Sequence, residues 1–435
     1  MKFISRLSRA LLISAVVLVP VHAARSTEVP QAVVDFYPQV MNAAPFLPSN
    51  LQSHRIGTAL PQRDSAHLYA SAAEVDYFSP GWEQRVSHDW QFFTAPAEAG
   101  RILVIDFKHS GEVNNPVLAY RYLANQASHN QLYEPWSSSK IFAYTGAIAA
   151  LRHSLQIGAN SLAGEVPIAD LITSIHSYQP FGKADGDSNA IATYFANVAG
   201  RDRLTALFHD QWLMLSNPAI RFRGAYGIKP FAPKDGLWHS QDQSYPVSAY
   251  ANSSDDPGYQ AYRCEHCGLT GNKPMTTLAQ AEWLKRLASH EREPLTRHPY
   301  LEAVDLEVLF FAGGRSQSAK PVGGMMQGIS LMLHKAIALA ISGDERADPQ
   351  QVLEQATGGQ WRIWQKIGWG DSETRGSGEV VVLAHVVLPD YQGGKEFTVA
   401  AQAAVAGEGE IYVNYAGIKI QQLLNQSMRE LLHDQ

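Results

Sequence analysis

Cysteine is almost absent from this chain, with two residues among 435, which excludes a disulfide-dense scaffold and a protein with several zinc sites. Lysine and arginine form no dense block, and the formal net charge is −6. That balance argues against nucleic acid as a partner, because binding a polyanion requires concentrated positive charge. Beyond the first 23 residues no long apolar run occurs, so no later segment is predicted to span a membrane.

What the chain does contain is the composition of a folded protein. Apolar residues make up 45% and charged residues 17% of the sequence, a balance too apolar for a disordered chain. The length fits two or three domains, or one elaborated domain.

The first 23 residues have the pattern of a secretory signal peptide. Lys2, Arg6 and Arg9 flank an apolar run at residues 10–19, and the small residue Ala23 stands where signal peptidase cleaves. Because that run is only about half of the roughly 20 residues that span a bilayer, cleavage after Ala23 is favoured over a permanent anchor. We therefore expect a periplasmic or secreted protein with no stable membrane insertion.

The rest of the chain suggests one fold built from both ends. Residues 24–100 have weak periodicity and predict an irregular N-terminal extension. The patterns predict strands at 101–108, 361–368, 379–388 and 396–404, and helices at 141–155, 189–208, 276–289, 330–342 and 411–432. This order indicates an α/β fold of the α+β kind: an antiparallel sheet from both chain ends, flanked by helices, with an inserted all-α domain. The α/β part covers about 101–130 and 359–433, and the helical part about 131–358.

The most informative stretch is Pro-Trp-Ser-Ser-Ser-Lys, which leads into the helix at 141–155. It places Ser137 and Lys140 three residues apart at a helix start, where their side chains are neighbours on one face. A lysine in a dry pocket has a lowered pKa and can take the proton of a serine hydroxyl. The helix N-terminus also favours negative charge at the serine. Taken alone, Ser137 could equally be a helix cap.

Two further segments carry chemistry only in combination. Lys366, Gly368 and Trp369 end a predicted strand, where a lysine offers a cation and the residue after the glycine an oxyanion-binding N–H. The alternative is a strand that ends in a glycine turn with a solvated lysine. In the sequence Asp187-Ser188-Asn189, a polar residue and an asparagine can relay a proton and hold an amide, or simply cap a helix.

In this order and spacing the three segments resemble the motifs of class A β-lactamases and penicillin-binding proteins. The resemblance covers about residues 100–433 and implies a serine hydrolase domain of that fold. It implies that Ser137 is the acylated nucleophile and Lys140 its base. The implied roles of the other matched residues are a proton relay at Asp187 or Ser188, an amide contact at Asn189 and positive potential from Lys366. The resemblance also implies an oxyanion hole from the backbone N–H groups of Ser137 and Trp369, substrate binding at Gly368, and a carboxylate contact from Arg375 on the following strand.

The sequence departs from the family pattern in three places. Asp187 stands where the family has serine or tyrosine, and Ile367 where it has a hydroxyl that binds the substrate carboxylate. No glutamate occurs between Asn189 and Cys264, where class A enzymes carry the base that activates the deacylating water. Slow hydrolysis of the acyl-enzyme is therefore expected.

Cys264 and Cys267 are separated by two residues. In an exported protein such a pair most often forms a short-range disulfide, whereas a redox pair or a zinc site is less favoured because no second ligand pair has the usual spacing.

Together these observations predict an exported serine hydrolase that forms an acyl-enzyme on Ser137. Its substrate would be an amide or ester, such as a β-lactam or a cell-wall peptide, and no cofactor or metal is required. Two alternatives stay open: a scaffold of the same fold that binds cell-wall peptide or a protein partner without turnover, and an esterase for small esters.

Overall fold

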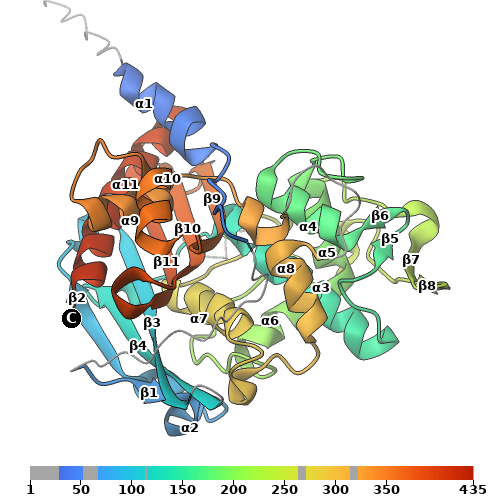
Figure 1. The fold of residues 1–435 in the computed structure, drawn as a ribbon. Helices are drawn as coiled ribbons and strands as arrows, with labels where there is room; N and C mark the ends of the chain where they lie inside the picture. Colours follow the sequence, from blue (N-terminus) through green and yellow to red (C-terminus); the bar gives the residue numbers. More distant parts are fainter. Residues whose placement is uncertain (1–28, 52–66, 113–114, 263–270, 314–321, 435) are drawn as a thin grey trace, which may run out of the picture.

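The central sheet joins the two ends of the chain. The computed structural model describes residues 29–51, 67–112, 115–262, 271–313 and 322–434. Within these residues seven strands form the sheet, in the order β1-β4-β3-β11-β10-β9, with β2 pairing parallel to β4 (Figure 1). The strands are β1 Ala70–Ser71, β2 His88–Phe93, β3 Arg101–Glu112, β4 Asn115–Asn125, β9 Arg362–Ser372, β10 Ser377–Leu388 and β11 Lys395–Ala406. The strand β9 therefore lies at one edge of the sheet.

Both faces of the sheet are apolar because helices cover both. In β3, Ile102 and Val104 join one core cluster, whereas Leu103 and Ile105 join the other, as expected from the two-residue period of a strand buried on both sides. The helices α9 Met332–Ser342, α10 Pro349–Thr357 and α11 Glu410–His433 form one layer, and α7 Thr277–Ala288 packs on the opposite face (Figure 1).

The N-terminal part is tied to this body. The helix α1 Gln31–Phe36 continues into a π-helical turn at Tyr37–Met41 and packs against α11. Further along, α2 Ala72–Val75 follows β1. The segment before Gly100, which was expected to be irregular, adds β1 and β2 to the sheet. The sequence shows no clear strand pattern there, because β1 has only two residues and β2 begins in a polar stretch.

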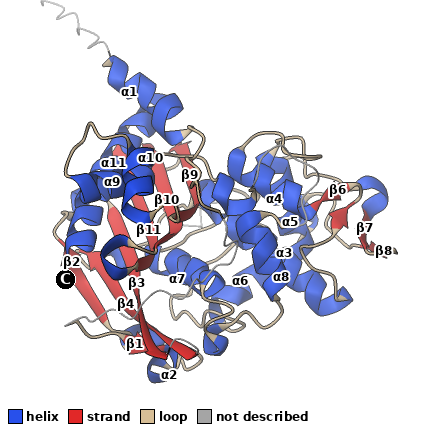
Figure 2. Cartoon of the chain, in the orientation of Figure 1, coloured by secondary structure: helices blue, strands red, loops and turns tan. Residues whose placement is uncertain are grey.

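The other half is mainly helical and lies beside the sheet (Figure 2). It contains α3 Lys140–Leu155, α4 Ile168–Ser177, α5 Ser188–Ala199, α6 Arg201–His209 and α8 Ala303–Phe311. It also holds a small sheet of β5 Leu162–Ala163, β6 Val166–Pro167, β7 Leu237–Ser240 and β8 Gln243–Pro246. The inserted half was expected to be all-helical, and this small sheet is a departure from that expectation. The helix predicted at 189–208 is two helices, because Gly200 has a φ of +75° between them.

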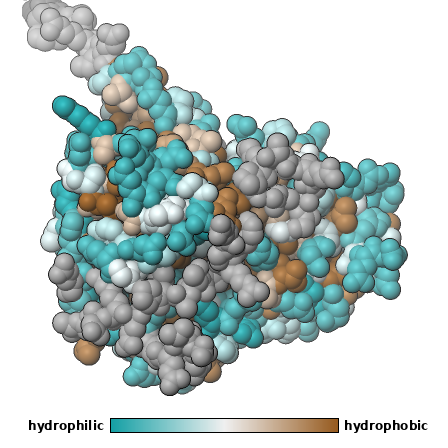
Figure 3. Space-filling model, viewed as in Figure 1, coloured by the Kyte–Doolittle hydropathy of each residue, from teal (hydrophilic) through white to brown (hydrophobic). Residues whose placement is uncertain are grey.

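The predicted fold class is confirmed: an antiparallel sheet from both chain ends, flanked by helices, with a helical insertion. On the face seen in Figure 3, hydrophilic residues predominate and hydrophobic residues appear in small separate groups. Among the described helices, none combines the length and the apolar character needed to cross a bilayer. The predicted signal peptide at 1–23 lies outside the described residues.

Candidate active site

The nucleophile segment is a single 3₁₀ turn at Trp136–Ser139 that leads directly into α3. Two of its three serines are engaged in holding the turn. Ser138 Oγ donates to the Pro135 carbonyl at 2.6 Å and accepts from Gln280 Nε2 at 2.7 Å. Ser139 Oγ donates to the Trp136 carbonyl at 2.6 Å. Ser137 does not cap the helix; its side chain lines a cavity of about 490 Å³.

Lys140 begins α3 and is fully buried. Its Nζ donates to Ser188 Oγ at 2.9 Å and to Asn189 Oδ1 at 2.7 Å. Burial lowers the pKa of Lys140 to about 7, with the Asp187 charge acting to raise it and the Lys273 charge acting to lower it. Near neutral pH a large fraction of this amine is therefore unprotonated and can accept a proton.

In the segment at 187–189, Asp187 caps a helix, whereas Ser188 and Asn189 contact Lys140. The Asp187 side chain is exposed and caps α5 by accepting from the Ala190 N–H at 2.9 Å. Ser188 is 4% exposed, and its hydroxyl, which donates to the Ile175 carbonyl, accepts from Lys140. Asn189 reaches the cavity that Ser137 lines. The structure thus turns Ser188, rather than Asp187, toward the lysine.

Tyr178 is the central side chain that the sequence did not reveal. It follows the last turn of α4 with a φ of +55°. Its hydroxyl accepts from Lys366 Nζ at 2.6 Å and hydrogen-bonds to Ser137. Its ring also faces Lys140, whose Nζ lies 5.0 Å from the ring centroid. The only local signal at this position is a helix end before Pro180, which says nothing about chemistry.

Lys366 faces the same group from β9. It is 1% exposed, and burial together with the charge of Lys140 holds its pKa well below the ordinary value. Its Nζ contacts the Tyr178 hydroxyl and, at 3.2 Å, the Ile367 carbonyl oxygen. Two buried lysines therefore lie against one tyrosine, and at neutral pH their mutual repulsion favours the neutral amine form.

The strand β9 passes close to the nucleophile turn because two of its residues are glycines. A Cβ on Gly368 would lie 2.7 Å from both the Ser137 and the Ser138 backbone nitrogens. A Cβ on Gly370 would overlap the Trp136 indole. Side chains at these two positions would separate the strand from the turn.

The free edge of β9 also sets the direction of the Trp369 backbone. The ring Nδ1 of His176 lies 3.0 Å from the Gln365 carbonyl oxygen, so the Gln365 backbone groups point away from β10. Backbone direction alternates along an antiparallel strand, and the register to β10 runs without a break through Trp369. The Trp369 N–H therefore points to the free edge, beside the turn that carries Ser137.

Arg375 and Ile367 do not present carboxylate-binding groups to the cavity. Arg375 lies in the turn between β9 and β10, not on the following strand as expected, because Gly376 turns the chain with a φ of +58°. Its guanidinium forms a two-point ion pair with Glu379, at 2.6 and 2.8 Å. Ile367 is fully buried in the core cluster under α11.

Glu134 supplies the cavity with a carboxylate that the sequence pattern did not reveal. It lies three residues before Ser137, is 1% exposed and lines the same cavity. Its Oε1 lies 3.3 Å from Lys273 Nζ, and its Oε2 has no hydrogen-bond partner among the described residues. Burial raises the pKa of Glu134, although Lys273 acts to lower it. Cys264 and Cys267, the predicted disulfide pair, lie outside the described residues.

Comparisons with known proteins were made by sequence and by structure. No family model and no curated protein matches the sequence. Similar solved structures include PBP-A, at 9% identity and a TM-score of 0.35, covering 76% of this chain and 90% of that chain. A class A beta-lactamase from Bacteroides cellulosilyticus is 10% identical with a TM-score of 0.38, covering 76% of this chain and 93% of that chain. The C-terminal domain of the Bacillus licheniformis BlaR penicillin-receptor is 12% identical with a TM-score of 0.34, covering 79% of this chain and 96% of that chain.

These similarities say nothing about activity at such identities and TM-scores. In the chain itself, the sheet comes from both chain ends and a helical half is inserted after β4. The Ser137–Lys140 turn lies against the edge strand β9. This arrangement agrees with the fold that the sequence resemblance to β-lactamases and penicillin-binding proteins implies.

Proposed function

We propose that this protein is a serine hydrolase that forms an acyl-enzyme on Ser137. The observation that carries the proposal is the position of the Ser137 hydroxyl. It hydrogen-bonds to a tyrosine that Lys366 also contacts and whose ring faces Lys140. Among the three consecutive serines, only Ser137 lines the cavity of about 490 Å³.

Acylation would use the lysines and Tyr178 as one proton-transfer group. Ser137 Oγ attacks the substrate carbonyl while its proton passes into this group, where the Lys140 amine is the acceptor available near pH 7. The N–H groups of Ser137 and Trp369 stabilise the negative oxygen of the tetrahedral intermediate. The Tyr178 hydroxyl, which accepts from Lys366, is placed to return a proton to the leaving group.

Deacylation requires a base for water, and this role is assigned to Glu134, a buried carboxylate that lines the Ser137 cavity. Its Oε2, which has no hydrogen-bond partner in the described part of the chain, and its raised pKa suit proton acceptance from water. Lys273, at 3.3 Å, would hold the carboxylate in place. This assignment would replace the glutamate that is missing between residues 189 and 264.

A substrate without an essential carboxylate fits the cavity best, which favours a neutral or cationic amide or ester. Ile367 faces the core, and Arg375 is paired with Glu379, so neither is placed to bind an anion. The exposed Glu373 and the half-buried Asp371 add negative charge to the cavity lining. A small neutral or cationic ester or amide would satisfy these requirements better than a penicillin, which carries a carboxylate.

The experiment that tests the proposal compares three serine variants. Wild type, Ser137→Ala, Ser138→Ala and Ser139→Ala are incubated with a nitrophenyl ester and, separately, with a penicillin, and intact-protein mass and ester hydrolysis are measured. We expect acylation and turnover to be lost in Ser137→Ala alone among variants that remain folded. Neither turnover nor an adduct in wild type would leave the non-catalytic binding scaffold as the better account, and equal turnover in wild type and Ser137→Ala would exclude Ser137 as the nucleophile.

Export forms part of the proposal and has its own test. We expect the mature chain to begin at Ala24 and to be recovered from the periplasm or the medium. N-terminal sequencing of the fractionated protein decides this, and a chain that retains residues 1–23 would contradict it.

A further inference from the structure

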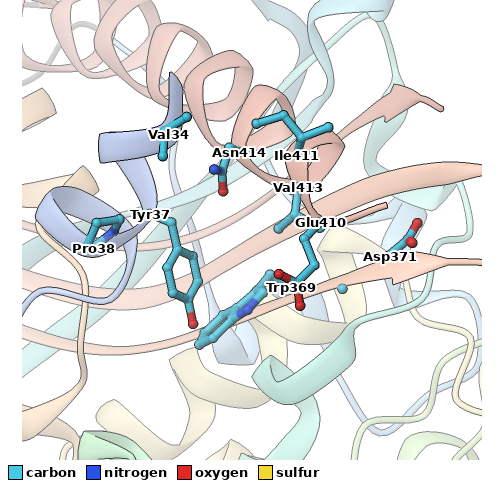
Figure 4. Close-up of a pocket in the computed structure, with 10 residues that line it drawn as sticks. Val34, Tyr37, Pro38, Trp369, Asp371, Glu410, Ile411, Val413 and Asn414 are labelled. Atoms are coloured by element: carbon cyan, nitrogen blue, oxygen red, sulfur yellow. The ribbon is translucent and has the colours of Figure 1, made fainter. Parts of the chain in front are cut away.

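A second cavity, of about 400 Å³, lies where the N-terminal helix meets the active-site strand (Figure 4). Its walls come from α1 and the turn after it, from the end of β9 and from the start of α11. Six of its side chains matter for the argument: Val34, Tyr37, Trp369, Asp371, Glu410 and Asn414. None of them belongs to a motif singled out in the sequence except Trp369.

This second cavity adjoins the one that holds Ser137. Trp369 and Asp371 line both. The Trp369 ring lies between two tyrosines, with centroid distances of 5.6 Å to Tyr37 and 5.3 Å to Tyr178. A group attached to a carbonyl at Ser137 could therefore extend past the edge of β9 into the second cavity.

The charged side chains that line the second cavity are both acidic. Asp371 and Glu410 are its carboxylates, and no lysine, arginine or histidine among the described residues contributes to the wall. Asp371 Oδ2 accepts from the Gly409 N–H at 2.8 Å, whereas Oδ1 is buried with no hydrogen-bond partner among the described residues. Neither carboxylate forms an ion pair within the described part of the chain.

We infer that the second cavity binds a primary ammonium group carried by the acyl part of the substrate. Aromatic faces attract cations, and Tyr37 and Trp369 supply two rings beside two carboxylates. A neutral alkyl chain would contact the apolar wall of Val34 but would form no ion pair with Asp371 or Glu410. The inference rests on the proposed function, because the substrate is positioned by acylation at Ser137.

The test compares two nitrophenyl esters of equal chain length. One carries the ε-aminocaproyl group and the other the heptanoyl group, so an ammonium is exchanged for a methyl. We expect wild type to prefer the ammonium ester in kcat/KM, and Glu410→Gln to reduce that preference by about threefold to fivefold, the range of one partly exposed ion pair. Glu408→Gln is the matched control, since it removes an exposed carboxylate two residues away that does not line the cavity.

A binding experiment separates this inference from the proposed catalysis. On the Ser137→Ala background, calorimetry compares ε-aminocaproamide with heptanamide, with and without Glu410→Gln. Preference for the ammonium amide that Glu410→Gln removes would support the subsite even if neither ester were turned over. Turnover of both esters with no ammonium preference would overturn the subsite and leave the hydrolase intact, as would an equal loss of preference in Glu410→Gln and Glu408→Gln.

Discussion

The Tyr178 hydroxyl lies 2.6 Å from Lys366 Nζ and hydrogen-bonds to Ser137, so a single phenol connects a lysine on the sheet to the proposed nucleophile on the helical half. Burial raises the pKa of Tyr178, which keeps the phenol protonated. A protonated phenol that accepts from a lysine can donate to a leaving group. This geometry makes Tyr178 the proposed proton donor in acylation.

Replacing this hydroxyl should slow acylation while leaving the pocket shape intact. We expect Tyr178→Phe to lower the acylation rate by about 10²- to 10⁴-fold, the usual contribution of one general acid or base. The measurement is the pre-steady-state release of nitrophenol. The matched control is Tyr226→Phe, which removes a hydroxyl in the same cavity that contacts Ser139 at 2.8 Å; a larger loss in the control would contradict the role of Tyr178.

The pH dependence of acylation should report the protonation of Lys140. Its pKa is lowered to about 7, and in the proposed mechanism the unprotonated amine is the active form. The rate therefore rises as pH increases through about 7 and levels off above that value. A profile that falls over this range would contradict a neutral Lys140 as base.

Two charge variants should move the midpoint of that profile in opposite directions. The Asp187 charge raises the pKa of Lys140 and the Lys273 charge lowers it. Asp187→Asn is therefore expected to shift the midpoint to lower pH, and Lys273→Met to higher pH. Shifts in the same direction would show that the profile reports another group.

The sequence predicted those parts of the site that local spacing defines. Ser137 and Lys140 are three residues apart at a helix start, and Lys366, Gly368 and Trp369 share one strand, so a motif can be read for each group. The fold class followed from strong strand and helix patterns at both chain ends. These features depend on neighbours in the chain.

The parts that could not be predicted depend on contacts between distant segments. Tyr178 reaches the site only because the chain after α4 turns back toward β9, and Glu134 meets Lys273 across 139 positions of sequence. Cavities formed by α1, β9 and α11 likewise have no local pattern. The weak strands β1 and β2 are fixed by pairing with β4 rather than by their own sequences.

The approach of β9 to the nucleophile turn predicts a strong effect of one methyl group. In Gly368→Ala the new Cβ would lie 2.7 Å from the Ser137 and Ser138 nitrogens and 2.6 Å from the Pro135 carbonyl oxygen. Backbone must then shift, and the oxyanion site with it. We expect a loss of about 10²- to 10³-fold in kcat, the value of one oxyanion donor.

The contrast for this variant is Gly370→Ala on the same strand. There the new Cβ would meet the Trp136 indole, a side chain that can rotate away, so the loss should be smaller. Thermal unfolding of both variants shows whether the fold is retained. Equal activity in Gly368→Ala and wild type would show that the Trp369 N–H does not contribute.

The last prediction concerns the step that frees the enzyme. If Glu134 activates water, Glu134→Gln should acylate at nearly the wild-type rate but hydrolyse the acyl-enzyme about 10²-fold or more slowly, and intact-protein mass should show an adduct that persists. Glu373→Gln provides the control, because it removes an exposed carboxylate from the lining of the same cavity. An adduct of equally long life in wild type and in Glu134→Gln would exclude Glu134 as the base and would support the slow hydrolysis expected from the missing glutamate between residues 189 and 264.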